Sequence, residues 1–232
     1  MIVKTKISNS TNGTRINGHS VHDIGDDHIH TGLKTPMRSD AFKMSDTEKK
    51  DKISDLFAQI MDVLGLDRTD DSLKGTPNRV AKMYVEEIFS GLNPKNEPKI
   101  SLFENNYQYN QMLVEKNITF YSNCEHHFVP IMGQAHIAYV SSGKVIGLSK
   151  LNRIVQYYAK RPQVQERLTN QIAIDLKTIL NTEDIAVIID AKHLCVSSRG
   201  VEDNASATVS SYYSGIFNEP QKIAELQNYL KQ

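Results

Sequence analysis

The sequence predicts an α+β fold, in which helices and an antiparallel sheet occupy separate stretches of the chain. Apolar residues at helical spacing and runs of β-branched and aromatic residues come in groups, and they do not alternate one by one as in a parallel βαβ fold. The groups lie, in order, at residues 45–64 and 76–91 (helical), 112–120 and 128–140 (strand), 151–180 (helical) and 185–217 (strand).

The composition excludes several classes of protein. The 232 residues carry 27 Lys and Arg against 27 Asp and Glu, so the formal charge is zero. A balanced charge argues against broad binding to nucleic acid or to an anionic membrane. No apolar run approaches the roughly 20 residues of a spanning helix, and a secretory signal is lacking. We therefore expect a cytoplasmic protein with no nucleic-acid or membrane partner.

Two regions differ along the chain. Residues 1–44 are rich in Ser, Thr, Asn, Gly, Asp and His and show no sustained period, so we expect a disordered N-terminal tail. The folded domain is expected over residues 45–232. Its first helix begins at Ser45, which can form a capping box with Glu48, and ends at Gly65.

The remaining elements follow from local signals. A second helix is predicted from Thr76, because Pro77 suits a first helical position. Arg161 and Pro162 interrupt the later helical block, since the residue before a proline avoids helical geometry. The predicted elements are a helix over 76–91, strands over 112–120 and 128–140, helices over 151–160 and 164–180, strands over 185–190, 193–198 and 208–217, and a closing helix over 221–230.

The two cysteines of the chain suggest a metal site. Cys124 and His127 have the Cys-x-x-His spacing, which lets one turn direct a thiolate and an imidazole at the same ion. Cys195 follows His193 in a later strand-like segment and could complete a Cys₂His set across the sheet. Three protein ligands leave one position open, as in a catalytic zinc site that activates water near neutral pH.

Other interpretations of these residues stay open at this point. Each cysteine could be a small buried apolar residue beside hydrogen-bonded histidines. A closed structural zinc site would need a fourth ligand, for which His126 is the candidate, although neighbouring side chains of an extended segment point to opposite faces. A nucleophilic Cys–His pair is a third interpretation.

Histidines and basic residues surround this candidate site in the sequence. His126 and His193 would be imidazoles beside the metal and suited to proton transfer, because an unperturbed histidine titrates near pH 6.5. Basic residues three apart on a helix share a face and could grip a polyphosphate, and two such pairs occur: Lys150 with Arg153, and Arg79 with Lys82. The sequence has no P-loop, so a nucleotide would be held by side chains and helix termini.

Four segments, taken in order, resemble the type I GTP cyclohydrolases. They are CEHHFVPI from Cys124, GLSKLNR ending at Arg153, RPQVQERLT from Arg161, and HLC from His193 followed by Arg199 and Gly200. The resemblance covers residues 45–218, so it identifies residues 45–232 as a GTP cyclohydrolase catalytic domain and leaves the N-terminal tail uncovered.

The resemblance implies a fold, a reaction and a cofactor. The implied fold is the tunnelling fold, an antiparallel β-sheet with helices packed on one side, assembled into a ring-shaped homodecamer with active sites between subunits. The implied reaction converts GTP to 7,8-dihydroneopterin triphosphate and formate, the entry to tetrahydrobiopterin or folate synthesis. The implied cofactor is Zn²⁺. Some relatives have a regulatory protein partner, and the sequence leaves such a partner open here.

The resemblance also implies roles for individual residues. Cys124, His127 and Cys195 match the zinc ligands, which agrees with the set chosen from spacing. His126 and His193 match the catalytic histidines. Glu166 matches the residue that accepts hydrogen bonds from guanine N1 and the 2-amino group, with Gln165 beside it. The positions that match contacts to ribose and triphosphate are Ser149, Lys150, Arg153 and Arg199, with Arg79 and Lys82 as contacts that a neighbouring subunit could supply.

The sequence departs from the family pattern in one segment, and it bears on several rival functions. Ser197 and Ser198 precede Arg199 where relatives commonly have an alanine, which could shift a triphosphate contact. Other tunnelling-fold members, such as a nitrile reductase or a pyruvoyl-tetrahydropterin synthase, are rival enzymes. The reductase would need a catalytic thiol without metal, which His127 and Cys195 argue against. A zinc nucleoside deaminase would need His-x-Glu and Pro-Cys-x-x-Cys motifs, and both are absent. The alternative from another class is a catalytically inactive relative that binds nucleotide or serves as a regulatory module.

Overall fold

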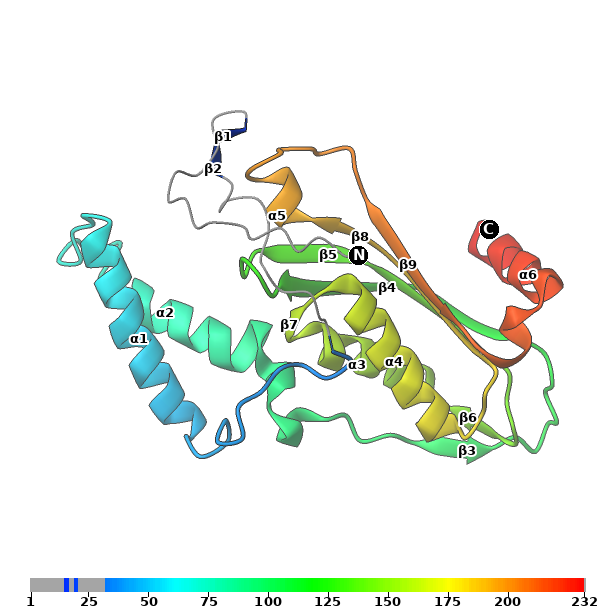
Figure 1. Ribbon diagram of the computed structural model, residues 1–232. Helices are drawn as coiled ribbons and strands as arrows, with labels where there is room; N and C mark the ends of the chain where they lie inside the picture. Colours follow the sequence, from blue (N-terminus) through cyan, green and yellow to red (C-terminus); the bar gives the residue numbers. More distant parts are fainter. Residues whose placement is uncertain (1–14, 17–18, 21–31, 232) are drawn as a thin grey trace, which may run out of the picture. The chain divides into compact units, whose positions relative to one another are not determined.

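The computed structural model describes residues 15–16, 19–20 and 32–231 of the chain (Figure 1). Strands β1 (Arg15–Ile16) and β2 (His19–Ser20) pair antiparallel within a first unit that ends at Thr31. The second unit, from Gly32 onward, holds all the other elements. Of the tail predicted over residues 1–44, the described part is β1, β2 and residues 32–44, which are irregular with a turn over residues 39–42.

A helical arm follows this turn. Helix α1 (Asp46–Val63) begins with the predicted capping box: the Ser45 hydroxyl accepts from the Glu48 amide, and the Glu48 carboxylate accepts from the Ser45 amide. Gly65 follows its end with a φ of 76°, where glycine avoids a steric cost. Helix α2 (Thr76–Lys82) has Pro77 in its first turn and continues as the π-helix η2 (Met83–Ile88). The short helices η3 (Ser90–Leu92) and η4 (Pro94–Asn96) lead on to the sheet.

The main sheet has five strands in the order β7-β4-β5-β8-β9. Its centre is the antiparallel pair β5 (Pro130–Tyr139) and β8 (Ile185–His193), flanked by β4 (Leu113–Cys124) and β9 (Thr208–Tyr213). Strand β7 (Pro162–Gln163) pairs parallel with β4, so the sheet is mixed. A second, two-stranded sheet joins β3 (Leu102–Glu104) to β6 (Lys144–Ile146). The strands predicted over 112–120 and 128–140 are confirmed; β3, β6 and β7 are too short to leave a pattern in the sequence.

Helices cover both faces of this sheet. Helices α3 (Leu148–Ala159) and α4 (Gln165–Leu180) pack on one face, where Ile137, Ile172 and Val187 are fully buried. Helix α6 (Pro220–Lys231), which follows the 3₁₀ helix η5 (Gly215–Asn218), covers one end of the other face. There Leu226 packs in a cluster with Ala138. The expectation of helices on one side alone is thus wrong at this end, because strand alternation also leaves apolar residues on the second face.

A strand predicted over 193–198 is not formed. Strand β8 ends at His193, and residues Leu194–Ser197 form the helical turn α5. His193 pairs with Ile131, and the partner strand β5 begins at Pro130, which has no amide hydrogen to extend the ladder. The chain closes a helical turn instead, in which the Ser198 amide donates to Leu194 O at 2.9 Å. No helix in the described parts of the chain has the length and apolarity needed to cross a bilayer.

Candidate active site and metal centre

A tight loop at the end of β4 carries one half of the site. The Cys124 amide donates to Val129 O at 2.9 Å, and the Phe128 amide donates to Cys124 O at 2.8 Å. Phe128 has a φ of 54°, an unfavourable conformation for a bulky residue. Its ring packs edge-on against Phe89, with centroids 4.9 Å apart, and this contact holds the strained turn. The closed loop brings the side chains of Cys124 and His127 together.

The other half lies where β8 meets α5. Among the described residues, the donor atoms of Cys124, His127 and Cys195 all lie within 4.8 Å of one another. The Cys124 sulfur is 3.8 Å from His127 Nδ1. Tetrahedral zinc, with bonds of about 2.3 Å to sulfur and about 2.0–2.1 Å to nitrogen, would set its donors roughly 3.5–3.8 Å apart. The three side chains therefore fit a metal ion of this size.

The donor chemistry agrees with the geometry. Burial, with Cys124 beside it, raises the pKa of the Cys195 thiol to about 11, so a thiolate at this position needs a cation next to it. Two sulfurs and one imidazole form a soft donor set that suits zinc. His126 is not part of this set in the described chain, although its Nδ1 lies 3.7 Å from the Cys124 sulfur. The arrangement therefore favours an open, three-ligand site over the closed structural one.

Gln165 fixes the orientation of His193. Its side chain is only 2% exposed, and its amide nitrogen lies 2.8 Å from Thr208 O and 3.1 Å from Ile189 O, which can only accept. Oε1 therefore faces His193, 2.8 Å from Nε2. Because Oε1 is an acceptor, the hydrogen is on Nε2, and Nδ1 is the basic atom of the neutral ring. Burial lowers the pKa of His193, which favours that neutral ring.

These contacts give the side chain of Gln165 a structural role, and its predicted substrate contact stays a prediction. The resemblance suggests a substrate contact, but in the structure its amide is committed to the sheet and to His193. Glu166, the next residue, is exposed on the first turn of α4, and its charge acts on His193. The structure thus separates two neighbours: Gln165 points into the protein, whereas Glu166 is accessible beside the candidate site.

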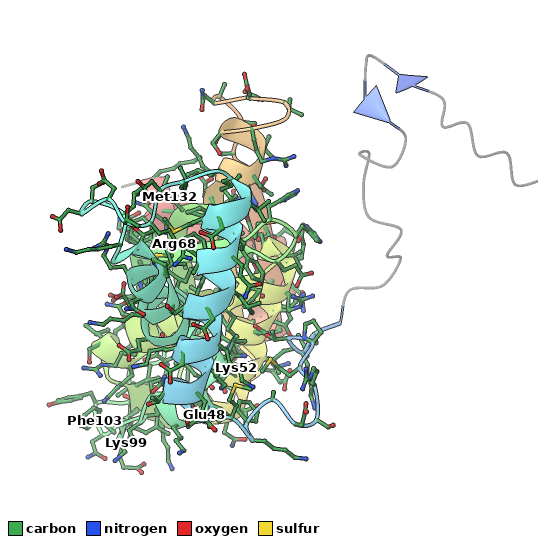
Figure 2. All side chains as sticks on the ribbon, turned by 90° about the vertical axis from the view of Figure 1, so that its left-hand side faces the viewer. Glu48, Lys52, Arg68, Lys99, Phe103 and Met132 are labelled. Atoms are coloured by element: carbon green, nitrogen blue, oxygen red, sulfur yellow. The ribbon has the colours of Figure 1, made fainter. Side chains whose placement is uncertain are left out.

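The predicted phosphate-binding residues fall into separate places. Lys150 and Arg153 line a groove of about 500 Å³ together with Lys99 and Lys160, and the metal donors do not line it. Figure 2 shows Lys99, which lines this groove, at the opposite end of the view from Met132. Met132 follows Ile131, which pairs with His193 of the candidate site. Exposed Ser149 adjoins Lys150 at the start of α3.

The remaining basic residues predicted to bind phosphate do not line this groove. Arg199 is close enough to Cys195 to act on its charge. Arg79 and Lys82 are exposed on α2, where the Arg79 guanidinium donates to Thr76 Oγ1 at 3.0 Å and to Ser72 O at 3.2 Å. The described chain therefore does not gather all of its predicted triphosphate contacts around its own metal donors.

An open Cys₂His donor set beside two histidines, at the ends of two strands of an α+β sheet, is the kind of site that metal-assisted hydrolases use. The comparisons with known proteins give this class a family. The family described as GTP cyclohydrolase I matches residues 53–231. The chain belongs to the GTP cyclohydrolase I family.

Individual relatives match most of the chain. A protein named GTP cyclohydrolase 1 from Flavobacterium johnsoniae is 61% identical over 209 residues, which cover 90% of this chain and 94% of the relative. One of the same name from Aeromonas salmonicida is 51% identical over 201 residues, or 86% and 91% of the two chains. A third, from Escherichia coli O1:K1, is 52% identical over 190 residues, or 82% and 86%.

Proposed function

We propose that this chain, a GTP cyclohydrolase by family, converts GTP to 7,8-dihydroneopterin triphosphate and formate with one zinc ion per active site. The observation that carries the proposal is the convergence of Cys124, His127 and Cys195 at the ends of strands β4 and β8. Zinc held by these three residues would supply an activated water for attack on guanine carbon 8. Overall, two water molecules are consumed when carbon 8 is released as formate, and one water molecule is released when the pterin ring closes.

The histidines are proposed to move protons in this sequence of steps. His193, held through Nε2 by Gln165, presents Nδ1 as a base. Opening of the imidazole ring, opening of the ribose and the Amadori-type rearrangement each need a proton taken from one atom and given to another. His126 lies on the Cys124 loop and His193 at the end of β8, so the pair can serve two sides of the reacting group.

Glu166 is proposed to select the base. Its carboxylate would accept hydrogen bonds from guanine N1–H and the 2-amino group, a donor pair that adenine lacks. A carboxylate left without these partners is costly once buried by substrate, so discrimination against ATP could reach about 10⁴-fold.

The triphosphate contacts are proposed to come from more than one copy of the chain. Ser149, Lys150 and Arg153 lie apart from the metal donors, so a neighbouring copy would bring them, or Arg79 and Lys82, to the site. The C-terminal half of α1, the helix that carries the labelled Glu48 and Lys52 in Figure 2, bears exposed apolar residues among its charged ones. These exposed apolar residues are Leu56, Ile60 and Val63, with Leu64 directly after the helix. Such a stripe suits burial between subunits, and the proposal includes a ring-shaped homodecamer in the cytoplasm that feeds folate or tetrahydrobiopterin synthesis.

The test measures product, metal and specificity together. The purified protein, with its zinc quantified and its mass determined by light scattering, is incubated with GTP or ATP, and formate and oxidised neopterin are followed. We expect about one zinc per chain, both products from GTP and neither from ATP. Glu166→Ala should retain zinc and lose GTP turnover, whereas exposed Glu219→Ala should match the unchanged protein. Zinc and GTP binding without formate would instead identify an inactive nucleotide-binding relative.

A further inference from the structure

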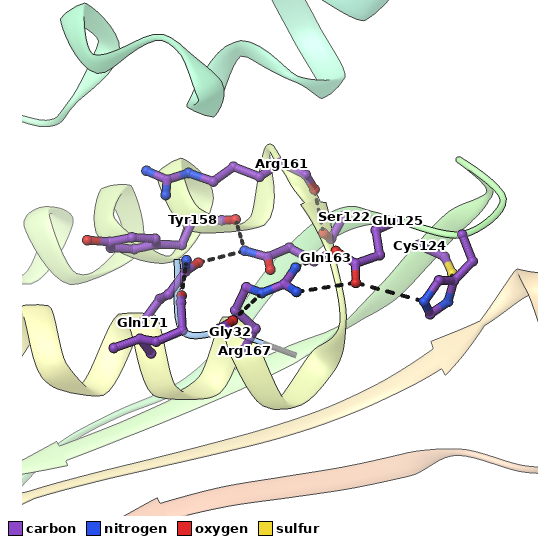
Figure 3. Close-up of polar contacts among 11 residues, drawn as sticks. Gly32, Ser122, Cys124, Glu125, Tyr158, Arg161, Gln163, Arg167 and Gln171 are labelled. Atoms are coloured by element: carbon purple, nitrogen blue, oxygen red, sulfur yellow. Dashed lines mark hydrogen bonds and ion pairs between the residues drawn. The ribbon is translucent and has the colours of Figure 1, made fainter. Parts of the chain in front are cut away.

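A network of charged and polar side chains reaches the Cys124 loop from inside the protein (Figure 3). Arg167 on α4 contacts Glu125 through two nitrogens: Nη1 binds Oε2, and Nη2 donates to Oε1 at 3.2 Å. Glu125 Oε1 in turn lies 3.8 Å from Nε2 of His126. Neither Glu125 nor Arg167 had a role in the sequence analysis, although both lie in the segments that carry the family resemblance.

Arg167 is held from its other side as well. Its side chain is 4% exposed, and Nε donates to Gly32 O at 2.8 Å. The next carbonyl, Leu33 O, accepts from Gln171 Nε2 at 2.8 Å. Gln171 Oε1 accepts from Gln163 at 2.8 Å. The guanidinium therefore has contacts along both edges and cannot turn without breaking several of them, so it is a rigid support for the Glu125 carboxylate.

The Glu125 carboxylate is not one of the candidate metal donors. Glu125 does not belong to the described set of donor atoms that lie within 4.8 Å of one another. Its two oxygens face Arg167, and one of them also faces the Nε2 edge of His126. At 3.8 Å this contact is electrostatic and longer than a hydrogen bond; it favours a hydrogen on Nε2 and restrains the ring, much as partners of metal-binding histidines do.

We propose that Glu125 is a positioning residue for His126, and that Arg167 holds Glu125 in place for this purpose. The inference rests on the proposed function, because His126 has a proton to move only if the chain processes GTP. It adds two residues to the reaction without placing either in contact with substrate. It also connects the backbone at Gly32 to a proposed catalytic histidine.

The main test replaces the carboxylate by an amide. Glu125→Gln should keep its zinc content and a GTP KM within about twofold, while kcat falls by about 10- to 100-fold, because only the orientation of His126 is lost. Glu125→Asp should recover part of the loss, since it keeps the charge. Arg167→Lys should have a kcat as low as that of Glu125→Gln, because an ammonium lacks the planar fork that holds the carboxylate. An unchanged kcat, or equal losses of kcat and zinc, would overturn the proposal.

A double variant separates positioning from folding. If Glu125 acts through His126, the pair Glu125→Gln with His126→Asn should be no slower than His126→Asn alone. Additive losses would count against the proposal. If Glu125→Gln unfolds because Arg167 is left without a partner, Glu125→Gln combined with Arg167→Met removes the buried charge. That variant should fold and stay slow, and full recovery of kcat would refute the inference.

The matched control is a second bidentate pair far from the site in sequence. Arg68 donates to Asp62 through Nε at 2.6 Å and Nη2 at 2.9 Å, but both side chains are exposed. Asp62→Asn should leave kcat, KM and zinc unchanged. A comparable loss of kcat in this variant would mean that any broken Arg–carboxylate pair slows the enzyme. That result would contradict a positioning role specific to Glu125.

Failure of the inference can be told from failure of the proposed function. If the unmodified protein releases no formate from GTP, the proposed function fails. The orientation is then read directly, from ¹⁵N-histidine spectra in which His126→Asn identifies the His126 signal. We expect a hydrogen on Nε2 in the unmodified protein and a loss of that preference in Glu125→Gln. Identical His126 signals in the two proteins would overturn the positioning role whether or not GTP is turned over.

Discussion

The loop that carries Cys124 and His127 is closed by local hydrogen bonds and packs through an aromatic contact, whereas the segment with His193 and Cys195 directly follows a strand that is paired on both sides. The aromatic contact of the loop is that of the Phe128 ring with Phe89. On the other side, β8 pairs along its length with β5 and along most of it with β9. The comparison teaches that the candidate metal site joins a strand-anchored half, here called the rigid half, to a loop half, here called the adjustable half, and that substitutions in the two halves should fail differently.

The largest effect is expected from removing a donor of the rigid half. Cys195→Ser should lose zinc and turnover together, because a hydroxyl is a poor replacement for a thiolate at a three-ligand site. The sheet should stay folded, since Cys195 is outside β8. Metal analysis, formate release and the melting temperature are measured on one preparation. Full activity in this variant would remove Cys195 from the site.

A smaller effect is expected from the support behind His193. Gln165→Leu keeps the bulk but loses the acceptor that fixes Nε2 and the donor to Thr208 O. We expect kcat to fall by about 10- to 100-fold with zinc retained. Thr182→Val, which removes a buried hydroxyl that donates to Val140 O at 3.2 Å, serves as the control for the stability cost of a lost hydrogen bond. Equal kcat values for the two variants would argue that Gln165 is structural only.

The adjustable half should respond through metal affinity. Phe128→Ala removes the ring that anchors the loop, so zinc should bind about tenfold more weakly, as measured by competition with a chromophoric chelator. Phe128→Gly relieves the positive φ and tests whether backbone strain matters more than packing. Exposed Phe103→Ala on β3 is the control. Should Phe128→Gly bind zinc as tightly as the unmodified protein, the ring would not be the anchor.

The smallest expected effect concerns the stability of the main sheet at low pH. Burial lowers the pKa of His136 on β5, and its Nδ1 accepts from the Asn117 amide at 3.2 Å, so the folded chain favours the neutral ring. Stability from this group is therefore present above its unfolded pKa of 6.5 and is lost as the pH falls toward the lower folded value. His136→Gln should lose less melting temperature than the unmodified protein between about pH 7.5 and about pH 5.5. A larger loss would reverse the sign of this argument.

Local signals predicted most of the framework. The capping box at Ser45, the break at Pro162 and the two long strands follow from chemistry within a few residues, and each is found in the structure. The strand predicted over residues 193–198 does not form, because a strand needs a pairing partner. Strand β5 begins at Pro130 and has no residues to pair with those after His193. The covering of the second sheet face by α6 also depends on packing between distant segments.

For the candidate site, the sequence by itself determined the residue types: two cysteines and a Cys-x-x-His spacing already define a soft donor set. Only the tertiary structure decided how these residues are used. It directs Gln165 toward His193, leaves Glu166 exposed, and brings Arg167 to Glu125 across 42 positions of the chain. The physical reason is that ligand chemistry belongs to single side chains, whereas orientation comes from hydrogen bonds between segments that meet only when the sheet and α4 pack together.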